Sequence, residues 1–346
     1  MSEYIRFEHI IKNFGEKKVL RDIDLSIEKG ELVTLLGPSG CGKSTLLRIL
    51  SGLEDATSGR IFLEGKDITD VAPQNRDIGM VFQHYSLFPN MNVRQNVAFG
   101  LKKKRVPKEE IDKTVSEMIE VVGLKDNVDQ YPSQLSGGQQ QRAALARALV
   151  TKPKVLLLDE PLSAIDALLR HSLQVEIRRI QKELNITAVF VTHDQEEAMV
   201  MSDRINLMHD GKIEQSARPI DLYTNPQSRF AATFIGHYNV LPAETFANAV
   251  SVAGATGISE LQNYETVAFR PEIVEISRQE RGSVPADSYL LRGRVAMSLP
   301  HGNFLRYNIS CGNATIDVDT LFNREKLFED GTEVWLMVPK EECILF

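Results

Sequence analysis

Length, composition and charge set the first limits on what this chain can be. It has 346 residues, of which 42% are hydrophobic and 25% charged, and these ordinary values exclude a disordered chain and a fibrous repeat. The formal net charge of -7 opposes broad attraction to a polyphosphate, so we expect no nucleic-acid partner.

The distribution of apolar residues and cysteines bears on location. Charged residues interrupt residues 1–20, so this segment lacks the apolar region of a signal peptide. No apolar run approaches the ~18 residues that span a bilayer. Cys41, Cys311 and Cys343 are widely spaced, which fits a reducing compartment and no zinc site. We therefore expect a cytoplasmic chain that needs a partner for any role at a membrane.

Strand-like apolar runs alternate with helical patterns from the N-terminus to about Ile235. Continuous Val, Leu and Ile are typical of strands that helices cover on both faces, and the alternation predicts a mainly parallel α/β sheet. We predict a first domain over residues 1–235. The segments that carry this prediction are the strands Leu32–Leu36, Val155–Leu158 and Ala188–Val191, a helix that begins at Lys43 and a helix over Ala167–Leu184.

Two stretches depart from this alternation. Between about residues 85 and 150 strand patterns are missing, and amphipathic patterns predict helices over Lys108–Val122 and Gln139–Val150. They indicate a helical subdomain inserted into the sheet. After Gly236 short alternating runs such as Thr266–Phe269 and Glu333–Val338 are separated by Gly, Asn and Asp. They predict an all-β barrel or sandwich as a second domain over residues 236–346.

A glycine-rich turn follows the strand Leu32–Leu36 and opens a helix. It fits the pattern G-x-x-x-x-G-K-[ST], in which glycines let successive amide N–H groups turn towards a phosphate at the helix N-terminus. Lys43 is expected to reach the β- and γ-phosphates, and the Ser44 hydroxyl to bind Mg²⁺, so we predict ATP and Mg²⁺ as cofactors. The nucleotide-binding residues predicted here are Gly37, Pro38, Ser39, Gly40, Cys41, Gly42, Lys43, Ser44 and Thr45.

Two carboxylates, Asp159 and Glu160, follow the strand Val155–Leu158, at the edge where open α/β sheets bind ligands. Taken alone, an acidic pair in this position is equally typical of a helix cap. Together with the phosphate loop, the pair predicts that Asp159 helps to hold Mg²⁺ and that Glu160 is the general base that polarises the attacking water.

A second candidate anion site lies at residues 135–142, Leu-Ser-Gly-Gly-Gln-Gln-Gln-Arg, where small residues expose backbone N–H groups at the start of a helix. One chain has little use for two phosphate sites around one nucleotide. This segment resembles the signature sequence of ABC ATPases, and the resemblance covers essentially all of residues 1–235. It implies a phosphate-loop (RecA-like) ABC ATPase core of the α/β class with an inserted helical subdomain.

The resemblance also implies how the second anion site is used. In ABC ATPases two subunits pack head to tail, and the signature of one closes on the γ-phosphate held by the phosphate loop of the other. We therefore expect a homodimer with ATP sandwiched between phosphate loop and signature. Ser136, Gly137, Gly138 and Gln139 are the residues expected to contact that nucleotide.

Four further residues match positions of the family. Phe14 stands where an aromatic side chain stacks on adenine, although Tyr or Trp is more usual, and a plain core aromatic is the alternative. Gln83 resembles the glutamine that touches Mg²⁺ and the attacking water. Asp166, in the D-loop-like segment Ser163–Asp166, is expected to communicate between the two sites. His193 resembles the switch histidine that hydrogen-bonds the γ-phosphate. The predicted catalytic residues are thus Lys43, Gln83, Glu160 and His193.

Hydrolysis has to be transmitted to a membrane protein. The segment His84–Met91 gathers aromatic and apolar residues at a predicted surface, which suits a groove for a short partner helix, whereas local core packing is the alternative. The resemblance implies integral membrane permease subunits as direct partners and an extracytoplasmic solute-binding protein as an indirect one. We expect a peripheral subunit at the cytoplasmic face of the cell membrane.

The C-terminal part of the sequence indicates which type of ABC ATPase this chain resembles. Phe269–Glu272 and the ending Trp335–Leu345 resemble the small oligonucleotide-binding-like (OB-like) domain of importer ATPases, with a regulatory or dimer-strengthening role. The stretches Val81–Tyr85 and Phe269–Arg278 look most like sulfate or thiosulfate importer ATPases, so we predict a sulfate-type anion as the solute. Importers of ferric iron, polyamines or phosphonates are the alternatives, and sugar importers rank lower.

Other classes of function are less consistent with the sequence. Soluble ABC ATPases of DNA repair insert a long coiled coil before the signature, whereas roughly a hundred residues without sustained heptads intervene here. Translation factors of this kind carry two cassettes, and we find one. A non-enzymatic oxyanion sensor is the third alternative, and the intact set Lys43, Asp159, Glu160 and His193 opposes it.

Overall fold

The fold is that of a computed structural model, which describes residues 3–163, 165–252, 259–279, 287–302, 304–323 and 327–346. Ala164 of the D-loop-like segment lies outside the described residues. The chain forms two compact units, Met1–Leu222 and Tyr223–Phe346. Helix α8 (Arg229–Ile235), which the sequence assigned to the first domain, falls in the second unit. Within the described ranges, no helix is both long and apolar enough to cross a membrane.

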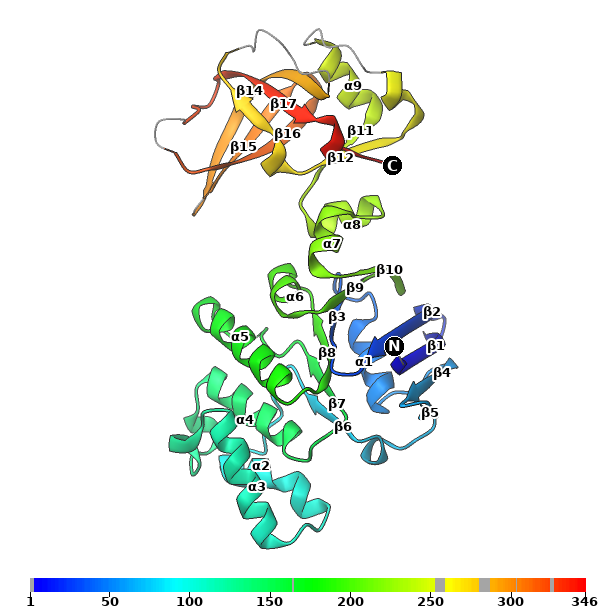
Figure 1. The fold of residues 1–346 in the computed structure, drawn as a ribbon, viewed down its shortest axis with the longest axis vertical. Coiled ribbons are helices and arrows are strands. Elements are labelled where there is room, and N and C mark those ends of the chain that lie inside the picture. The colour runs from blue at the N-terminus through cyan, green and yellow to red at the C-terminus, as the bar shows by residue number, and fades with distance from the viewer. Residues whose placement is uncertain (1–2, 164, 253–258, 280–286, 303, 324–326) are drawn as a thin grey trace. The chain divides into compact units, whose positions relative to one another are not determined.

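A six-stranded sheet forms the centre of the first unit (Figure 1). Its order is β10-β9-β3-β8-β7-β6, and its paired strands run parallel except for β10, which is antiparallel to β9. Every residue of β3, β7 and β8 is buried, as the sequence predicts for strands covered on both faces. The strands are β3 (Leu32–Leu36), β6 (Ile78–Val81), β7 (Val155–Asp159), β8 (Thr187–Thr192), β9 (Arg204–His209) and β10 (Lys212–Ala217).

The two faces of this sheet belong to two hydrophobic cores. Leu156 and Leu158 of β7 pack in one core with the helical subdomain, whereas Val155 and Leu157 pack in the other with α1 (Lys43–Ser51) and the N-terminal strands. This division follows from the alternation of side chains along a strand. The sheet is therefore a layer between two separately packed cores.

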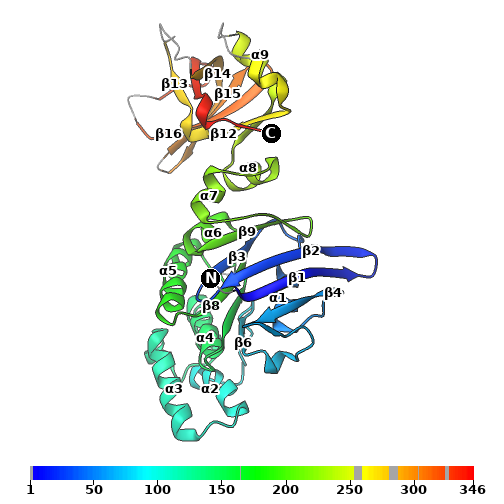
Figure 2. The same cartoon turned by 45° about the vertical axis from the view of Figure 1, so that its right-hand side comes forward.

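An antiparallel sheet of order β2-β1-β4-β5 flanks the second core, and Figure 2 shows β1, β2 and β4 beside α1. This sheet was not expected from the sequence. The sequence does contain a signal for these strands, because charged residues alternate with apolar ones along much of β1 and β2. Most of the apolar residues are buried. The strands are β1 (Glu3–Phe14), β2 (Lys17–Glu28), β4 (Ser58–Leu63) and β5 (Lys66–Asp67).

The inserted helical subdomain is confirmed. It consists of α2 (Val93–Lys103), α3 (Lys108–Val121) and α4 (Gly137–Leu149), which lie together low in Figure 1. Helix α4 begins two residues earlier than predicted, because Ser136 caps it and lets the helix include both signature glycines.

The other described helices before residue 236 are short apart from α5. They are α5 (Ala167–Glu183), α6 (Gln195–Met201), α7 (Pro219–Thr224) and α8, with 3-10 turns at Pro73–Asn75, Lys125–Asn127, Pro132–Gln134, Ser259–Asn263, Pro271–Ile273 and Lys340–Glu342.

The second unit consists mainly of antiparallel strands around one core, as expected of an OB-like domain. Its sheets have the orders β11-β12-β18 and β13-β17-β14-β15-β16. Helix α9 (Ala243–Val252) was not predicted; it contributes the fully buried Phe246, whose ring centroid lies 5.4 Å from that of Phe269. The strands are β11 (Asn239–Pro242), β12 (Thr266–Phe269), β13 (Glu275–Ser277), β14 (Ser288–His301), β15 (Phe304–Cys311), β16 (Ala314–Leu321), β17 (Glu333–Pro339) and β18 (Ile344–Leu345).

Arg76 holds the C-terminal end of α1. Its side chain is buried, and its guanidinium donates to the carbonyl oxygens of Ile49 (2.8 Å) and Leu50 (2.9 Å), which belong to the last turn of the helix. It also donates to those of Val71 (2.6 Å) and Thr69 (2.7 Å). One side chain thus supplies a donor to the helix-end carbonyl of Leu50 and a second donor to that of Ile49, which also accepts from the amide of Gly52 at 3.1 Å.

We predict that Arg76→Met lowers the free energy of unfolding by about 3 kcal/mol, because it leaves several buried carbonyls without donors. The measurement is the midpoint of urea unfolding, monitored by circular dichroism. Arg60→Met is the control, since Arg60 is exposed on β4, and it should change stability by less than about 0.5 kcal/mol. Equal midpoints for the two variants would contradict the capping role.

Candidate functional site

The phosphate-loop residues form the turn between β3 and α1, at the carboxyl edge of the central sheet. A side chain at Gly37 would place its Cβ 2.2 Å from the carbonyl oxygen of Met208, and Gly42 has φ of 106° with Leu20 Cδ2 only 2.5 Å from a Cβ position. Both positions therefore require glycine. The turn borders a cavity of about 490 Å³ lined by Phe14, Lys17, Val19, Ser39, Gly40, Gly42, Lys43, Ser44, Thr45 and Glu160.

The first two residues of α1 have different partners. The buried Lys43 donates from Nζ to the carbonyl oxygens of Gly37 (2.7 Å) and Pro38 (2.9 Å). Ser44 Oγ donates to Asp159 Oδ1 at 2.8 Å. A hydroxyl and a carboxylate are hard oxygen ligands of the kind that Mg²⁺ prefers, so this pair fits the predicted metal site.

Glu160 has an unusual backbone conformation. It directly follows β7 with φ of 45°, a region that costs a non-glycine residue of order 1 kcal/mol or more and persists only where the surroundings fix it. Its amide donates to the carbonyl oxygen of Val191 at 3.1 Å. Its Oε2 lies 3.4 Å from Nδ1 of His193, which follows β8. Two residues that are far apart in sequence and predicted to be catalytic therefore lie side by side.

Arg170, which the sequence analysis missed, joins the D-loop-like segment to the segment after β8. Its guanidinium donates to the carbonyl oxygen of Ile165 at 3.1 Å and contacts Asp194 Oδ2 at 3.4 Å. Nearby, the hydroxyl of Thr192 donates to Glu197 Oε2 at 2.6 Å, and burial raises the pKa of Glu197. No sequence pattern marks Arg170, because its contacts depend on how α5 and α6 pack.

Phe14 lies at the end of β1 and is 48% exposed, which does not fit a core aromatic. Its ring lines the phosphate-loop cavity, and the Lys12 ammonium lies 4.6 Å from the ring centroid. An exposed aromatic face at the rim of the cavity is open to a stacking ligand.

The signature residues form the N-terminus of α4. Ser136 Oγ accepts from the amide of Gln139 (3.4 Å), and Gln139 Oε1 accepts from the amide of Ser136 (2.8 Å), so the pair makes a capping box. Ser136 and Gly137 are exposed. Among the described residues that line the phosphate-loop cavity, none belongs to the signature. Within one chain, the two predicted anion sites are therefore separate.

Gln83 and Asp166 lie outside the lining of that cavity, as far as the described residues show. Gln83 is exposed in the loop after β6. Asp166 caps α5, with Oδ1 accepting from the amide of Leu169 at 3.1 Å. The structure gives Asp166 a capping contact, and the roles of both residues in a closed dimer stay predictions.

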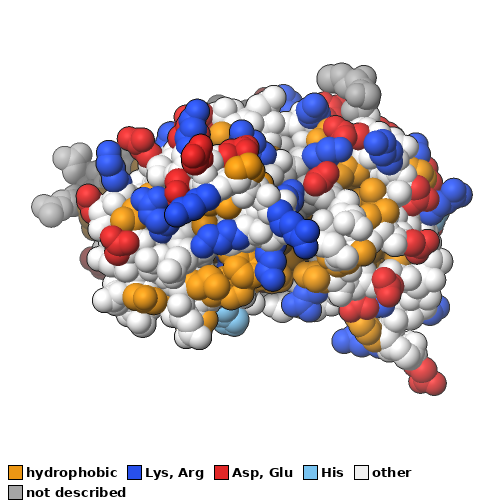
Figure 3. Space-filling model, turned by 90° about the horizontal axis from the view of Figure 1, so that it is seen from below, with side chains coloured by type: hydrophobic (Ala, Val, Ile, Leu, Met, Phe, Trp, Pro, Cys, Tyr) orange, Lys and Arg blue, Asp and Glu red, His pale blue; other side chains and the backbone are white. Residues whose placement is uncertain are grey.

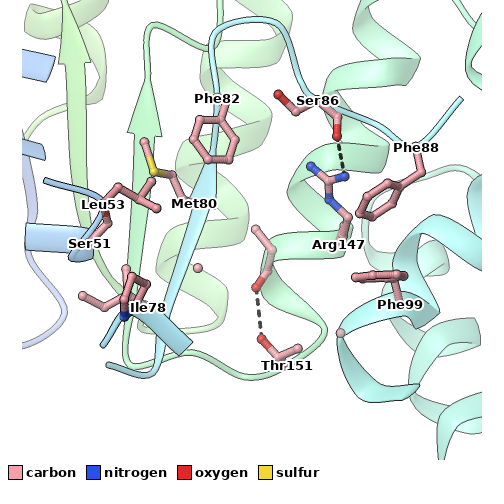
Figure 4. A pocket seen from close by; sticks show the side chains of 14 residues that line it. Ser51, Leu53, Ile78, Met80, Phe82, Ser86, Phe88, Phe99, Arg147 and Thr151 are labelled. Atoms are coloured by element: carbon pink, nitrogen blue, oxygen red, sulfur yellow. Dashed lines mark hydrogen bonds between the residues drawn. The ribbon is translucent and has the colours of Figure 1, made fainter. Parts of the chain in front are cut away.

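A second cavity of about 490 Å³ lies between β6, α2 and α4, and we call it the aromatic groove (Figure 4). The rings of Phe88 and Phe99 lie 4.4 Å apart in its wall. Within the predicted segment His84–Met91, Ser86 and Phe88 line the groove, whereas Tyr85 is buried in the core. Both interpretations of this segment therefore hold in part: some of its residues line a groove, and another packs in the core. The full lining is Ser51, Leu53, Pro73, Ile78, Gly79, Met80, Phe82, Ser86, Phe88, Phe99, Gly100, Arg147, Ala148 and Thr151.

Comparison with solved structures supports this fold. A dimeric ATP-binding cassette in a post-hydrolysis state, bound to ADP and Pi, aligns with a TM-score of 0.56 and 32% sequence identity. The alignment covers 62% of this chain and 98% of that one.

Comparison with known sequences identifies the family. The family model described as ABC transporter matches residues 20–163. The Fe(3+) ions import ATP-binding protein of Pectobacterium atrosepticum is 48% identical over 285 residues, 80% of each chain. The spermidine/putrescine import ATP-binding protein of Clostridioides difficile is 43% identical over 346 residues, 98% of this chain and 96% of the relative. The sulfate/thiosulfate import ATP-binding protein of Synechococcus elongatus is 48% identical over 273 residues, which cover 79% of this chain and 77% of the relative. The chain therefore belongs to the ABC transporter family, as an ATP-binding subunit of the importer type.

Proposed function

We propose that this chain is the ATP-hydrolysing subunit that drives solute import, coupling ATP-dependent closure of its dimer to separate permease subunits. One observation carries the proposal: the phosphate loop, the Ser44–Asp159 pair and the Glu160–His193 pair gather at one edge of the central sheet. Phosphate binding, metal ligands and a base are the parts that one phosphoryl transfer to water needs.

The phosphate loop binds and orients the nucleotide. Lys43 exchanges its carbonyl contacts with Gly37 and Pro38 for oxygens of the β- and γ-phosphates. Ser44 and Asp159, with Gln83, would hold Mg²⁺, which when bound would neutralise part of the phosphate charge. The ring of Phe14 stacks on adenine at the rim of the cavity.

Glu160 and His193 act at the γ-phosphate. The Glu160 carboxylate accepts a hydrogen bond from the attacking water and takes its proton as the oxygen bonds to phosphorus, while the bond to the bridging oxygen of ADP breaks. His193 donates a hydrogen bond to the γ-phosphate from beside this carboxylate. The left-handed conformation of Glu160 fixes where its side chain begins.

We predict that Glu160→Gln reduces ATP turnover by about 10²–10⁴-fold, because it removes the base, but leaves ATP binding intact. Turnover is measured as phosphate release, and binding by the fluorescence of a trinitrophenyl nucleotide. Glu196→Gln serves as the matched control, since Glu196 is an exposed glutamate near the same edge. Wild-type turnover in Glu160→Gln would disprove the assigned role.

The separate position of the signature supports a dimer in which each nucleotide lies between two chains. Ser136 and Gly137 are exposed at the N-terminus of α4, where amide groups and the helix dipole favour a phosphate. The solved cassette with which this chain aligns is itself a dimer. The γ-phosphate of ATP then bridges the phosphate loop of one chain and Ser136–Gln139 of the other.

We expect the molecular mass of the Glu160→Gln variant to double at saturating ATP and Mg²⁺. With ADP, which lacks the bridging phosphate, the variant should remain a monomer. Light scattering after size exclusion measures this. Adding Ser136→Glu should keep the chain monomeric, because a carboxylate at the signature repels the phosphate. An unchanged mass with ATP would argue against the sandwich.

The aromatic groove is the surface proposed to receive the permease. Its apolar lining suits the apolar face of a short helix. Seen from the side of α2 and α3, Lys and Arg side chains gather beside exposed hydrophobic ones (Figure 3). The importer relatives are named as ATP-binding proteins, which implies that permease and solute-binding subunits are separate chains. A peripheral place at the cytoplasmic face of the membrane follows from this arrangement.

A sulfate-type anion stays our prediction for the solute. The relatives named for iron, polyamine and sulfate import match at 48%, 43% and 48% identity, so overall similarity does not identify the solute. The physical reason is that an ATP-binding subunit of this design contacts no solute.

Uptake assays decide the solute. We expect cells that express this chain with the permease and solute-binding protein encoded beside it to accumulate radiolabelled sulfate, and Lys43→Ala to abolish this uptake. Uptake of ferric iron or spermidine in place of sulfate would overturn the solute prediction and leave the importer intact. ATP hydrolysis without uptake of any of the three would contradict the import function proposed for these solutes.

A further inference from the structure

The loop between β6 and α2 contains two consecutive residues in an unfavourable conformation. Tyr85 and Ser86 have φ of 57° and 47°, a region that is uncommon for residues other than glycine. Each costs of order 1 kcal/mol and needs an external constraint to persist. The Tyr85 hydroxyl does not provide this constraint, because it is buried with no hydrogen-bond partner among the described residues.

Arg147, on α4, supplies that constraint. Its guanidinium donates to the carbonyl oxygen of Ser86 at 2.7 Å, the contact drawn in Figure 4. It also donates to the carbonyl oxygen of Tyr85 at 2.9 Å, so it bonds both strained residues. The planar fork of arginine is suited to two such acceptors, and lysine cannot reproduce it.

Arg147 is half-buried in the wall of the aromatic groove. Desolvation lowers the pKa of its guanidinium, and among the described residues no carboxylate forms an ion pair with it. The charge is compensated by the two carbonyl dipoles and by the ring of Phe88, whose centroid lies 5.3 Å from the guanidinium carbon. A partly desolvated cation held in this way costs stability unless these partners stay in place.

The same side chain connects three parts of the molecule. Arg147 and Phe88 line the aromatic groove, and Phe88 packs on Phe99 of α2. Gln83, which is predicted to touch Mg²⁺ and the attacking water, stands two residues before Tyr85. At the other end of α4, about three turns away, Ser136 begins the signature.

We propose that Arg147 is a positioning residue of the ATPase: by clamping the carbonyls of Tyr85 and Ser86 it fixes the loop that carries Gln83 to the signature helix. A displacement at the groove then moves Gln83 and α4 together. This inference rests on the proposed functions of Gln83, the signature and the groove. Arg147 lines the aromatic groove and does not line the phosphate-loop cavity.

The first test is steady-state hydrolysis of ATP by the full chain. We expect Arg147→Ala to lower kcat at least about 10-fold while KM and trinitrophenyl-nucleotide binding change less than 2-fold, because the phosphate loop is untouched. Arg147→Lys should recover only part of kcat. Lys103→Ala is the matched control: Lys103 is an exposed cation 5.6 Å from the Phe99 ring, and its loss should leave kcat unchanged.

The second test separates a clamp from a general loss of stability. Guanidinium ion at about 10 mM fits the space left in Arg147→Ala, and we expect it to restore kcat several-fold without affecting Lys103→Ala. Hydrogen exchange of the amides of residues 84–88 should be faster in Arg147→Ala and slower again with guanidinium. Loss of kcat that follows the melting temperature and is not rescued would overturn the proposal.

The outcomes also distinguish this inference from the proposed function. If the chain were no ATPase, the wild type and Lys103→Ala would both fail to release phosphate. If only the clamp were wrong, the wild type would hydrolyse ATP and Arg147→Ala would do so at the same rate.

Discussion

The close approach of the phosphate loop to β9 is the contact on which the site depends. β3 pairs in parallel with both β9 and β8, and at its end Gly37 lies so near Met208 that a Cβ would come within 2.2 Å of the carbonyl oxygen. This contact fixes the turn against the sheet, so α1 starts where its first residues, Lys43 and Ser44, border the cavity. A rigid edge of parallel strands is what allows distant residues to meet there.

Among the non-glycine residues with positive φ, which also include His9, Asp77 and Lys152, three lie where the proposed mechanism needs fixed geometry. Glu160 has φ of 45° beside His193, and Tyr85 and Ser86 have φ of 57° and 47° beside the aromatic groove. In each case neighbouring groups hold the strained residue: a bond to the carbonyl of Val191 in the first, and the guanidinium of Arg147 in the second. Such local costs are expected where precise placement matters more than stability.

Helix α4 belongs to both proposed interfaces of the subunit. Its N-terminus carries the exposed signature, and its last turns contribute Arg147 to the wall of the groove. A helix is stiff along its axis, so events at one end are transmitted to the other without a separate connecting element. This gives a physical reason why a single hydrolysis site and a membrane partner can be coupled through one segment.

The sequence by itself determined the nucleotide chemistry and the strands and helices that carry its motifs. Local signals were sufficient there, because the phosphate loop, the acidic pair after β7 and the continuous strands β7 and β8 are each encoded within a few residues. The solute was not determined, since relatives named for iron, polyamine and sulfate import share the same motifs and similar identities. The contacts of Arg170 and Arg147 were decided only by tertiary structure, because their partners lie on other elements and no periodicity marks them. Helix α9 was also revealed only by the tertiary structure. The strained turns at Glu160 and Tyr85 could not be predicted either, because packing imposes a positive φ on residues that do not favour it.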